Sequence, residues 1–166
     1  SDKGELEEAE KFYRRALAGR EKALGQNHPH TLYSASDLGS FLEDKGDHEG
    51  AEDLYRQALE GFEKTKGANH SSTLAVGLSL GNLLSDKGDY EGAEEFYRRS
   101  VAGYKKVLGS GHSDTLSSVN NLEILLRKKG DLEGAEKLFR QALEGNARQA
   151  AELSLEAIGV EDRLSQ

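Results

Sequence analysis

The chain has 166 residues, of which 36% are hydrophobic and 31% are charged, and its formal net charge is −8. Nucleic-acid binding rests on positive side chains, so this acidity argues against it, and the apolar run of ~18 residues that a membrane-spanning helix needs is missing. The lack of cysteine excludes disulfides, thiolate nucleophiles and cysteine-based zinc sites, and it fits a reducing compartment, so we expect a cytoplasmic protein.

The whole sequence, residues 1–166, is one array built from a unit that returns every 42 residues without insertion. A Lys-Gly pair opens each of the four copies, at residues 3, 45, 87 and 129. When the four copies are aligned, each position of the repeat forms a column of equivalent residues. Seven columns are identical in all four copies: those of the Lys and Gly just named, and those of Glu7, Ala9, Glu10, Arg14 and Gly19. Each unit reads as two helices that cannot bury both faces alone, so stacked neighbours must cover them. The pattern predicts an all-α solenoid of antiparallel helix pairs.

Residues 1–25 are predicted to be the second helix of a repeat whose first helix is not in the sequence. Its apolar stripe would then be partly uncovered, and we expect two copies of the chain to associate through it. The stripe consists of Leu6, Ala9, Tyr13 and Ala16.

Three complete units follow, at 26–67, 68–109 and 110–150, each with a linker and two helices. The first helices are predicted near 31–45, 73–87 and 115–129. Each ends at a glycine, which takes the left-handed conformation without a Cβ clash, and the next aspartate caps the second helix. These pairs are Gly46-Asp47, Gly88-Asp89 and Gly130-Asp131.

The second helices are predicted to run about 18 residues, to Gly25, Gly67 and Gly109. Their apolar positions recur at the spacing of a core-facing helix. In the first complete unit these positions are Ala51, Tyr55, Ala58 and Leu59.

Three further columns need an explanation. The histidines at 28, 70 and 112 recur one repeat apart and so cannot converge on one ion; we expect a structural role and no metal or other cofactor. The glycines at 19, 61, 103 and 145 lie inside the second helices at a cost of ~1 kcal/mol each, which indicates close approach by a neighbouring helix. Phe62 and Tyr104 share a column with Arg20 and Asn146, so part of that column should face solvent or a partner.

Residues 151–166 form a C-terminal extension or cap. Ala151 replaces the linker glycine, and the segment that follows favours helix. Either the last helix continues to about Ile158 and ends at Gly159, or it breaks near residues 145–146 and a short capping helix follows. We favour the extended helix.

The spacing of Gly39, Gly46, Ala51, Tyr55 and Ala58 resembles the tetratricopeptide repeat. The period of 42 is similar to the longer repeats of kinesin light chains and nephrocystin-type proteins. The resemblance implies a right-handed superhelix that binds a partner peptide or helix in a concave groove lined by the first helices, without catalysis. No phosphate-binding loop and no Ser-His-acid set is predicted. The alternative function is a structural spacer or oligomerisation segment of a larger receptor, motor adaptor or scaffold.

The resemblance also implies which residues line the groove. Some family members grip a peptide backbone with an Asn in the column of Asp37, Ser79 and Asn121, where only Asn121 matches. Glu123 occupies the position at which the other two repeats have the small residues Gly39 and Gly81. Either the third helix pair is therefore splayed, or Glu123 pairs with a nearby Arg or Lys. The implied groove residues are Tyr33, Ser36, Asp37, Ser40, Glu43, Leu78, Ser79, Asn82, Ser117, Asn120, Asn121, Ile124 and Arg127.

The groove residues and their neighbours also form a charge gradient. Asp37, Glu43 and Asp44 mark the first pair, whereas Arg127 and the following lysines mark the third. Such a groove could orient a peptide that carries opposite charges at its two ends. The same charges would also be ordinary for solvated helix ends.

Overall fold

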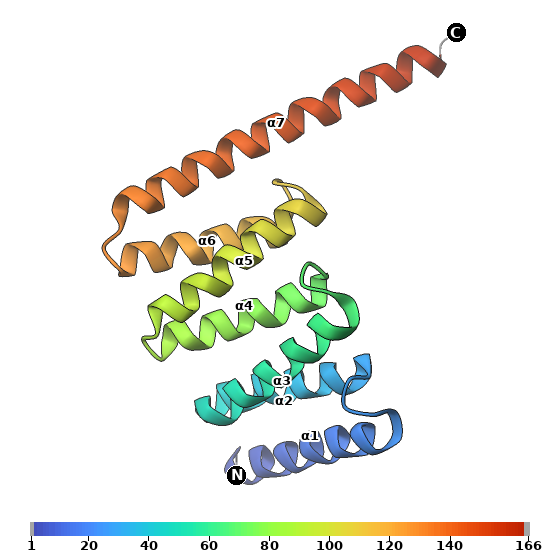
Figure 1. The fold of residues 1–166 in the computed structure, drawn as a ribbon, viewed down its shortest axis with the longest axis vertical. Helices are drawn as coiled ribbons and strands as arrows, with labels where there is room; N and C mark the ends of the chain where they lie inside the picture. Colours follow the sequence, from blue (N-terminus) through green and yellow to red (C-terminus); the bar gives the residue numbers. More distant parts are fainter. Residues whose placement is uncertain (1, 165–166) are drawn as a thin grey trace. The chain divides into compact units, whose positions relative to one another are not determined.

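The computed structural model describes the backbone of residues 2–164 and the side chains of residues 4–152. This part of the chain forms seven α-helices and no strands, which confirms the all-α prediction. Contacts divide it into two compact units, residues 1–96 and 97–166, with the boundary inside α5. In the first unit, Figure 1 shows α1 to α4 running alternately in opposite directions. The helices are α1 (Asp2–Leu24), α2 (Pro29–Lys45), α3 (His48–Lys66), α4 (Ser71–Asp86), α5 (Tyr90–Leu108), α6 (Ser113–Lys128) and α7 (Leu132–Leu164).

The turn within each helix pair is made by a left-handed glycine and a capping aspartate, as predicted. Gly46 has a φ of 89°, and Oδ1 of Asp47 accepts a hydrogen bond from the backbone N–H of Gly50 at 3.0 Å. This bond satisfies an N–H group of the first helical turn that has no partner within the helix. The arrangement recurs at Gly88 (φ 84°) with Asp89 and Gly92 at 3.0 Å, and at Gly130 (φ 82°) with Asp131 and Gly134 at 2.8 Å.

The linker histidine is the N-cap of the helix that follows it. Nδ1 of His28 accepts a hydrogen bond from the backbone N–H of His30 at 3.2 Å, and Pro29 occupies the first helical position. The predicted structural role of the linker histidine is therefore confirmed, and that role is to cap the next helix. Because of this cap, α2, α4 and α6 begin two residues before the predicted starts. The equivalent bonds join His70 to the N–H of Ser72 at 3.1 Å and His112 to the N–H of Asp114 at 3.2 Å.

The core of the first unit lies between α2 and α3 and is built from the predicted stripe. The four stripe residues of α3 are at most 8% exposed, and Leu38 and Leu42 on α2 are 1% exposed. A Cβ on Gly39 would lie 3.0 Å from Cε1 of Tyr55, so the small residue lets the aromatic ring approach α2. This burial is what holds the pair together, at about 25 cal/mol per Å² of apolar surface removed from water.

The glycines inside the second helices differ from one another. A Cβ on Gly61 would lie 2.3 Å from Cδ2 of Leu32, and one on Gly145 would lie 2.9 Å from Oγ of Ser110. Close approach by a neighbouring helix is therefore confirmed at Gly61, whereas Gly145 is approached by a residue of the linker between α5 and α6. The prediction of close approach is wrong at Gly19, because a Cβ there would meet no atom within 4 Å.

The last helix is continuous. α7 spans 33 residues, passing Ala151 without a turn and extending through Gly159 to Leu164. The predicted extension is confirmed, but the predicted end at Gly159 is wrong, because a single glycine inside a helix costs only ~1 kcal/mol. None of the described helices combines the length and apolarity needed to cross a bilayer.

The contrast between Gly61 and Gly19 gives a stability prediction. We expect Gly61→Ala to lower the free energy of unfolding by about 1–3 kcal/mol, because Leu32 is 1% exposed and has no room to move away. Gly19→Ala makes the same chemical change in an open place and should be neutral or stabilising by up to about 1 kcal/mol. Urea unfolding of both variants measures the difference; equal effects would show that the contact with Leu32 does not limit the size of residue 61.

Candidate interaction surface

The exposed side of α2 is a single stripe along the helix. Its exposed residues lie three or four positions apart, as residues on one helical face must. Of the predicted groove residues on α2, Tyr33, Asp37 and Ser40 are exposed, and Ser36 and Glu43 are partly buried. The prediction therefore placed most of this set on an accessible face. The full stripe is His30, Tyr33, Asp37, Ser40 and Asp44.

The predicted residues of α4 and α6 are less uniform. On α4, which contacts α2 within the first unit, Leu78, Ser79 and Asn82 are all partly buried. In the second unit, the predicted residues of α6 are mostly accessible. Ser117, Asn120, Ile124 and Arg127 are exposed there, and Asn121 is partly buried.

Tyr33 connects α2 to the neighbouring helices. Its hydroxyl lies 2.5 Å from Oγ of Ser72, and Nζ of Lys66 donates to the same hydroxyl at 3.2 Å. The Lys66 ammonium also lies 5.1 Å from the centre of the Tyr33 ring, a cation–π distance. The Ser72 hydrogen bond, then that of Lys66, lowers the pKa of the Tyr33 phenol. Tyr33 is still 41% exposed, so it presents a positioned aromatic edge to the outside.

Beneath Tyr33 lies Phe62, whose ring centre is 5.0 Å from that of Tyr33. Phe62 is 0% exposed and Tyr104 is 4% exposed. Part of this column faces solvent, as predicted, because Arg20 is exposed, whereas its two aromatic members are buried.

Glu43 mainly serves the helix pair. The hydroxyl of Tyr55 on α3 donates a hydrogen bond to Oε2 of Glu43 at 2.7 Å. Burial, and then this carboxylate, raise the pKa of Tyr55 well above its ordinary value. Glu43 thus satisfies a buried phenol, which limits what it can offer to a ligand.

Arg127 is also engaged within the chain. Its Nε lies 2.6 Å from Oε1 of Glu123 on the same helix, and the Glu123 side chain is 17% exposed. Of the two outcomes considered for Glu123, the structure shows the pairing. The positive end of the supposed gradient is thus partly neutralised, and its two ends fall in different units.

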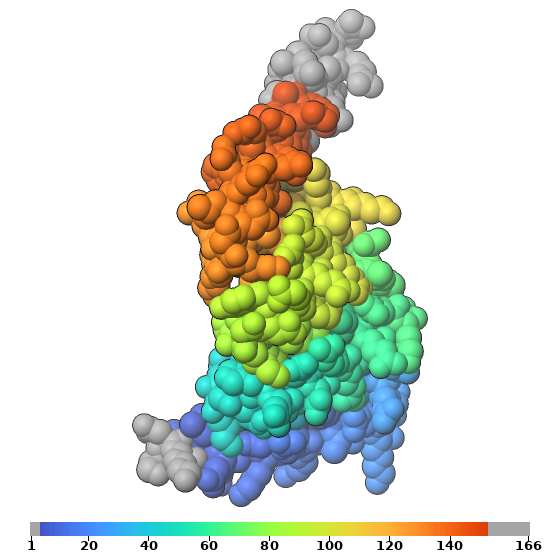
Figure 2. Space-filling model, turned by 60° about the vertical axis from the view of Figure 1, so that its left-hand side comes forward, coloured from blue at the N-terminus to red at the C-terminus, as the bar shows by residue number. Residues whose placement is uncertain are grey.

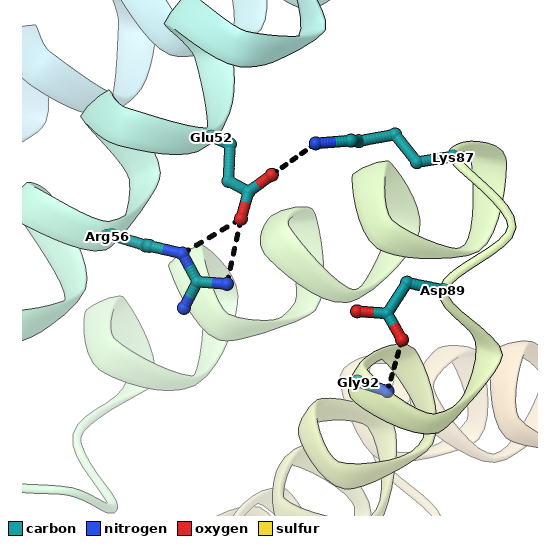
Figure 3. Close-up of polar contacts among 5 residues, drawn as sticks. All are labelled: Glu52, Arg56, Lys87, Asp89 and Gly92. Carbon is teal, nitrogen blue, oxygen red and sulfur yellow. Dashed lines mark hydrogen bonds and ion pairs between the residues drawn. The ribbon is translucent and has the colours of Figure 1, made fainter.

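Three of the columns that are identical in every repeat form a clamp between neighbouring repeats (Figure 3). Oε1 of Glu52 accepts hydrogen bonds from Nε and Nη2 of Arg56 at 3.0 and 2.8 Å, and Oε2 accepts one from Nζ of Lys87 at 2.5 Å. Lys87 stands just after α4, so the carboxylate links α3 to the next repeat. One repeat earlier, Glu10 makes the same bonds to Arg14 at 3.0 Å and to Lys45 at 2.5 Å.

The sequence analysis did not assign a role to this clamp. Its signal was present, since the Lys, Glu10 and Arg14 columns are three of the seven that never vary. Glu10 and Glu52 each bind a lysine of the next repeat, so the repeated charge has a structural role there.

Comparison with known proteins identifies the family to which these repeats belong. A sequence model of the tetratricopeptide repeat matches residues 1–64, 34–106 and 72–148, which together cover most of the chain. The chain belongs to the tetratricopeptide repeat family. Tetratricopeptide repeats are generally protein–protein interaction modules.

Solved tetratricopeptide structures resemble this chain over 89% of its length. One is a Podospora anserina protein named as a kinesin light chain with nearly identical TPR-like repeats; identity is 26%, the TM-score is 0.79, and 70% of that chain is covered. Another is BtubC (BKLC) from P. vanneervenii, with 23% identity, a TM-score of 0.77 and 59% of that chain covered; this likeness shows the fold alone. A search of curated proteins finds no significant match.

The clamp makes the stability of these tetratricopeptide repeats depend on pH. The hydrogen bond of Lys87, then that of Arg56, lowers the pKa of Glu52 from its ordinary value of 4.5. A lowered pKa in the folded state means that the stabilisation is present above that ordinary value and is lost as pH falls through the folded pKa.

We therefore expect Glu52→Gln to lower the free energy of unfolding by about 1 kcal/mol near pH 7, and the two proteins to converge as the pH falls through the lowered pKa of Glu52. Glu60→Gln is the control, because Glu60 pairs only along its own helix, with Lys64 at 2.5 Å, and should change little. Urea unfolding at several pH values in this range measures the difference. If the free energies of unfolding of the Glu52 variant and the parent differ by the same amount at every pH, the ion pair is not the cause of that difference.

Proposed function

We propose that this chain is a non-catalytic scaffold that binds a partner protein, through an extended peptide or a helix laid along the exposed stripe of α2 and its neighbour α4. The observation that carries the proposal is the division of roles among the repeat columns. The identical charges link and align neighbouring repeats, whereas the accessible positions of the first helices change from copy to copy. The Tyr33 column reads Tyr33, Ala75 and Ser117, and the Asp37 column reads Asp37, Ser79 and Asn121.

The chemistry of the α2 stripe favours a basic partner. Asp37 and Asp44 are exposed along it, and Ser40 lies between them on the same face. Tyr33 adds an aromatic edge held by Ser72 and Lys66, so it loses little freedom when a ligand packs on it. A peptide with Lys or Arg near the acids and an apolar residue near Tyr33 would match this surface. We place this interaction in the cytoplasm, because the cysteine-free sequence suits a reducing compartment.

The test is a peptide-display selection against the whole chain, followed by affinity measurements on the enriched peptides. We expect Asp37→Arg to weaken the binding of these peptides at least about tenfold. Binding of the same peptides to the parent should weaken as the salt concentration is raised. Asp53→Arg on α3 makes the same charge change at another exposed position and should have no effect. Enriched peptides that bind the Asp37 variant as well as the parent would refute this location for the site.

The spacer or oligomerisation role is the second candidate, and the surface of α1 favours it. Leu6 is 45% exposed and Phe12 is 68% exposed, while Tyr13 is partly covered by the Phe41 ring of α2 at 5.2 Å. The predicted stripe is therefore open mainly at Leu6, and Phe12 extends the apolar surface beyond it.

If copies associate through α1, the apparent mass of the parent should rise with concentration. The Phe12→Asp variant should then stay monomeric, because a carboxylate cannot be buried in an apolar contact without several kcal/mol of desolvation. Multi-angle light scattering after gel filtration measures this. A parent that is monomeric at every concentration tested would eliminate self-association through this helix.

A further inference from the structure

The second helices of the first unit each have one face covered by the first helix of the next repeat. On α1, Glu10 binds Lys45 and the Tyr13 ring lies 5.2 Å from that of Phe41. Nearer the other end of this face, the guanidinium of Arg20 donates to Oγ of Ser34. Residue numbers fall along one helix as they rise along the other, so the two pack antiparallel.

α3 repeats this interface against α4. Glu52 binds Lys87 as Glu10 binds Lys45. Further along the same face, a Cβ on Gly77 of α4 would lie 3.9 Å from Cδ1 of Leu59, and Leu59 is only 8% exposed. One set of columns therefore defines a docking face that recurs on α1 and α3.

On α7 the same columns are uncovered. They hold Glu136, Phe139 and Leu143, and the two apolar side chains are each 54% exposed. The Glu136 side chain is 71% exposed and pairs with Arg140 of its own helix at 2.6 Å, as Glu52 pairs with Arg56. Figure 2 shows the described part of α7, in orange, at the surface of the molecule.

A cavity of about 350 Å³ lies beside this face, within the second unit. It is bounded by α6 through Glu123 and Arg127 and by α7 through Leu132 and Phe139, among others. Leu132 is itself 66% exposed, so the cavity is an open, partly apolar hollow next to the docking columns.

The described part of α7, which runs to Leu164, does not turn back over this face. The helices before it end at Gly25, Gly67 and Gly109, whose φ values of 89–90° reverse the chain into the next covering helix. At the equivalent position α7 has Ala151 and remains helical to Leu164. The covering helix that α1 and α3 receive is therefore not supplied to α7 by the residues up to Leu164.

We propose that the α7 face of Glu136, Phe139 and Leu143 binds an amphipathic helix of a separate protein, in the antiparallel arrangement that α2 adopts on α1. The chemistry of that helix follows from the interface that this chain uses twice. It carries apolar residues about one turn apart, as Leu38 and Phe41 do on α2, and a lysine one turn later, like Lys45. The apolar pair covers Leu143 and Phe139, and the lysine reaches Glu136.

The probe is a synthetic peptide with the sequence of residues 29–47, which contains this pattern, added to the intact chain and followed by fluorescence anisotropy. We expect Phe139→Asp to weaken binding at least about tenfold, because it removes the central apolar contact. Val107→Asp in α5 is the matched control, since Val107 is also exposed, at 52%, and should not matter. Circular dichroism confirms that both variants keep the parent's helix content.

A charge exchange tests the register independently of apolar adhesion. Glu136→Lys should weaken the peptide about two- to fivefold, as expected for one exposed ion pair. A peptide with Lys45→Glu should recover that loss on the Glu136→Lys protein. Equal binding to the parent and the Phe139→Asp variant, or no recovery in the exchanged pair, would overturn the proposal. Dimers of the chain alone that vanish with Phe139→Asp would overturn it too, because a second copy would then be the occupant.

Discussion

A left-handed glycine ends every helix that is followed by another helix in the described chain. These glycines lie 21 residues apart, at 25, 46, 67, 88, 109 and 130, with φ between 82° and 90°. Side chains with a Cβ rarely adopt this conformation, so glycine sets where the chain reverses and hence how long each helix is. The equal spacing of these glycines keeps the same columns opposite each other from one helix pair to the next. Where Ala151 replaces the glycine, the reversal is lost and α7 continues.

This regularity separates two kinds of residue that look alike in the sequence. A charged column that never varies, that of Glu10 and Glu52, is used inside the molecule to link one repeat to the next. Accessible positions that differ between copies, such as that of Asp37, are not held to one residue by this link, and they form the surface that we propose for a partner. Identity between repeats therefore indicates structure here, and variation on an accessible face indicates where recognition can differ along the array.

The sequence predicted the local structure well because the responsible residues are adjacent. The glycine turns, the aspartate caps and the stripe of α3 all follow from spacings within one helix pair. The helix starts were placed two residues late, because histidine is not among the preferred N-cap residues and its ring gave no obvious signal. The site was harder to predict. Helical periodicity gives the face on which a residue lies but not its partner, so Glu43 and Arg127 were assigned to the groove although one binds Tyr55 and the other Glu123.

Magnitudes decide which interaction holds the repeats together and which one aligns them. Burying a large apolar side chain such as Tyr55 or Phe62 contributes about 1.5–3 kcal/mol, whereas an accessible ion pair contributes about 0–1 kcal/mol. Apolar burial therefore supplies most of the energy of stacking. Close packing, such as that of Tyr55 against Gly39, also favours the observed fit. The clamp adds a directional contact between neighbouring repeats, because the Glu52 carboxylate must lie within reach of the Lys87 ammonium. The same division applies to the open face of α7, where Phe139 and Leu143 would provide affinity and Glu136 would select the alignment.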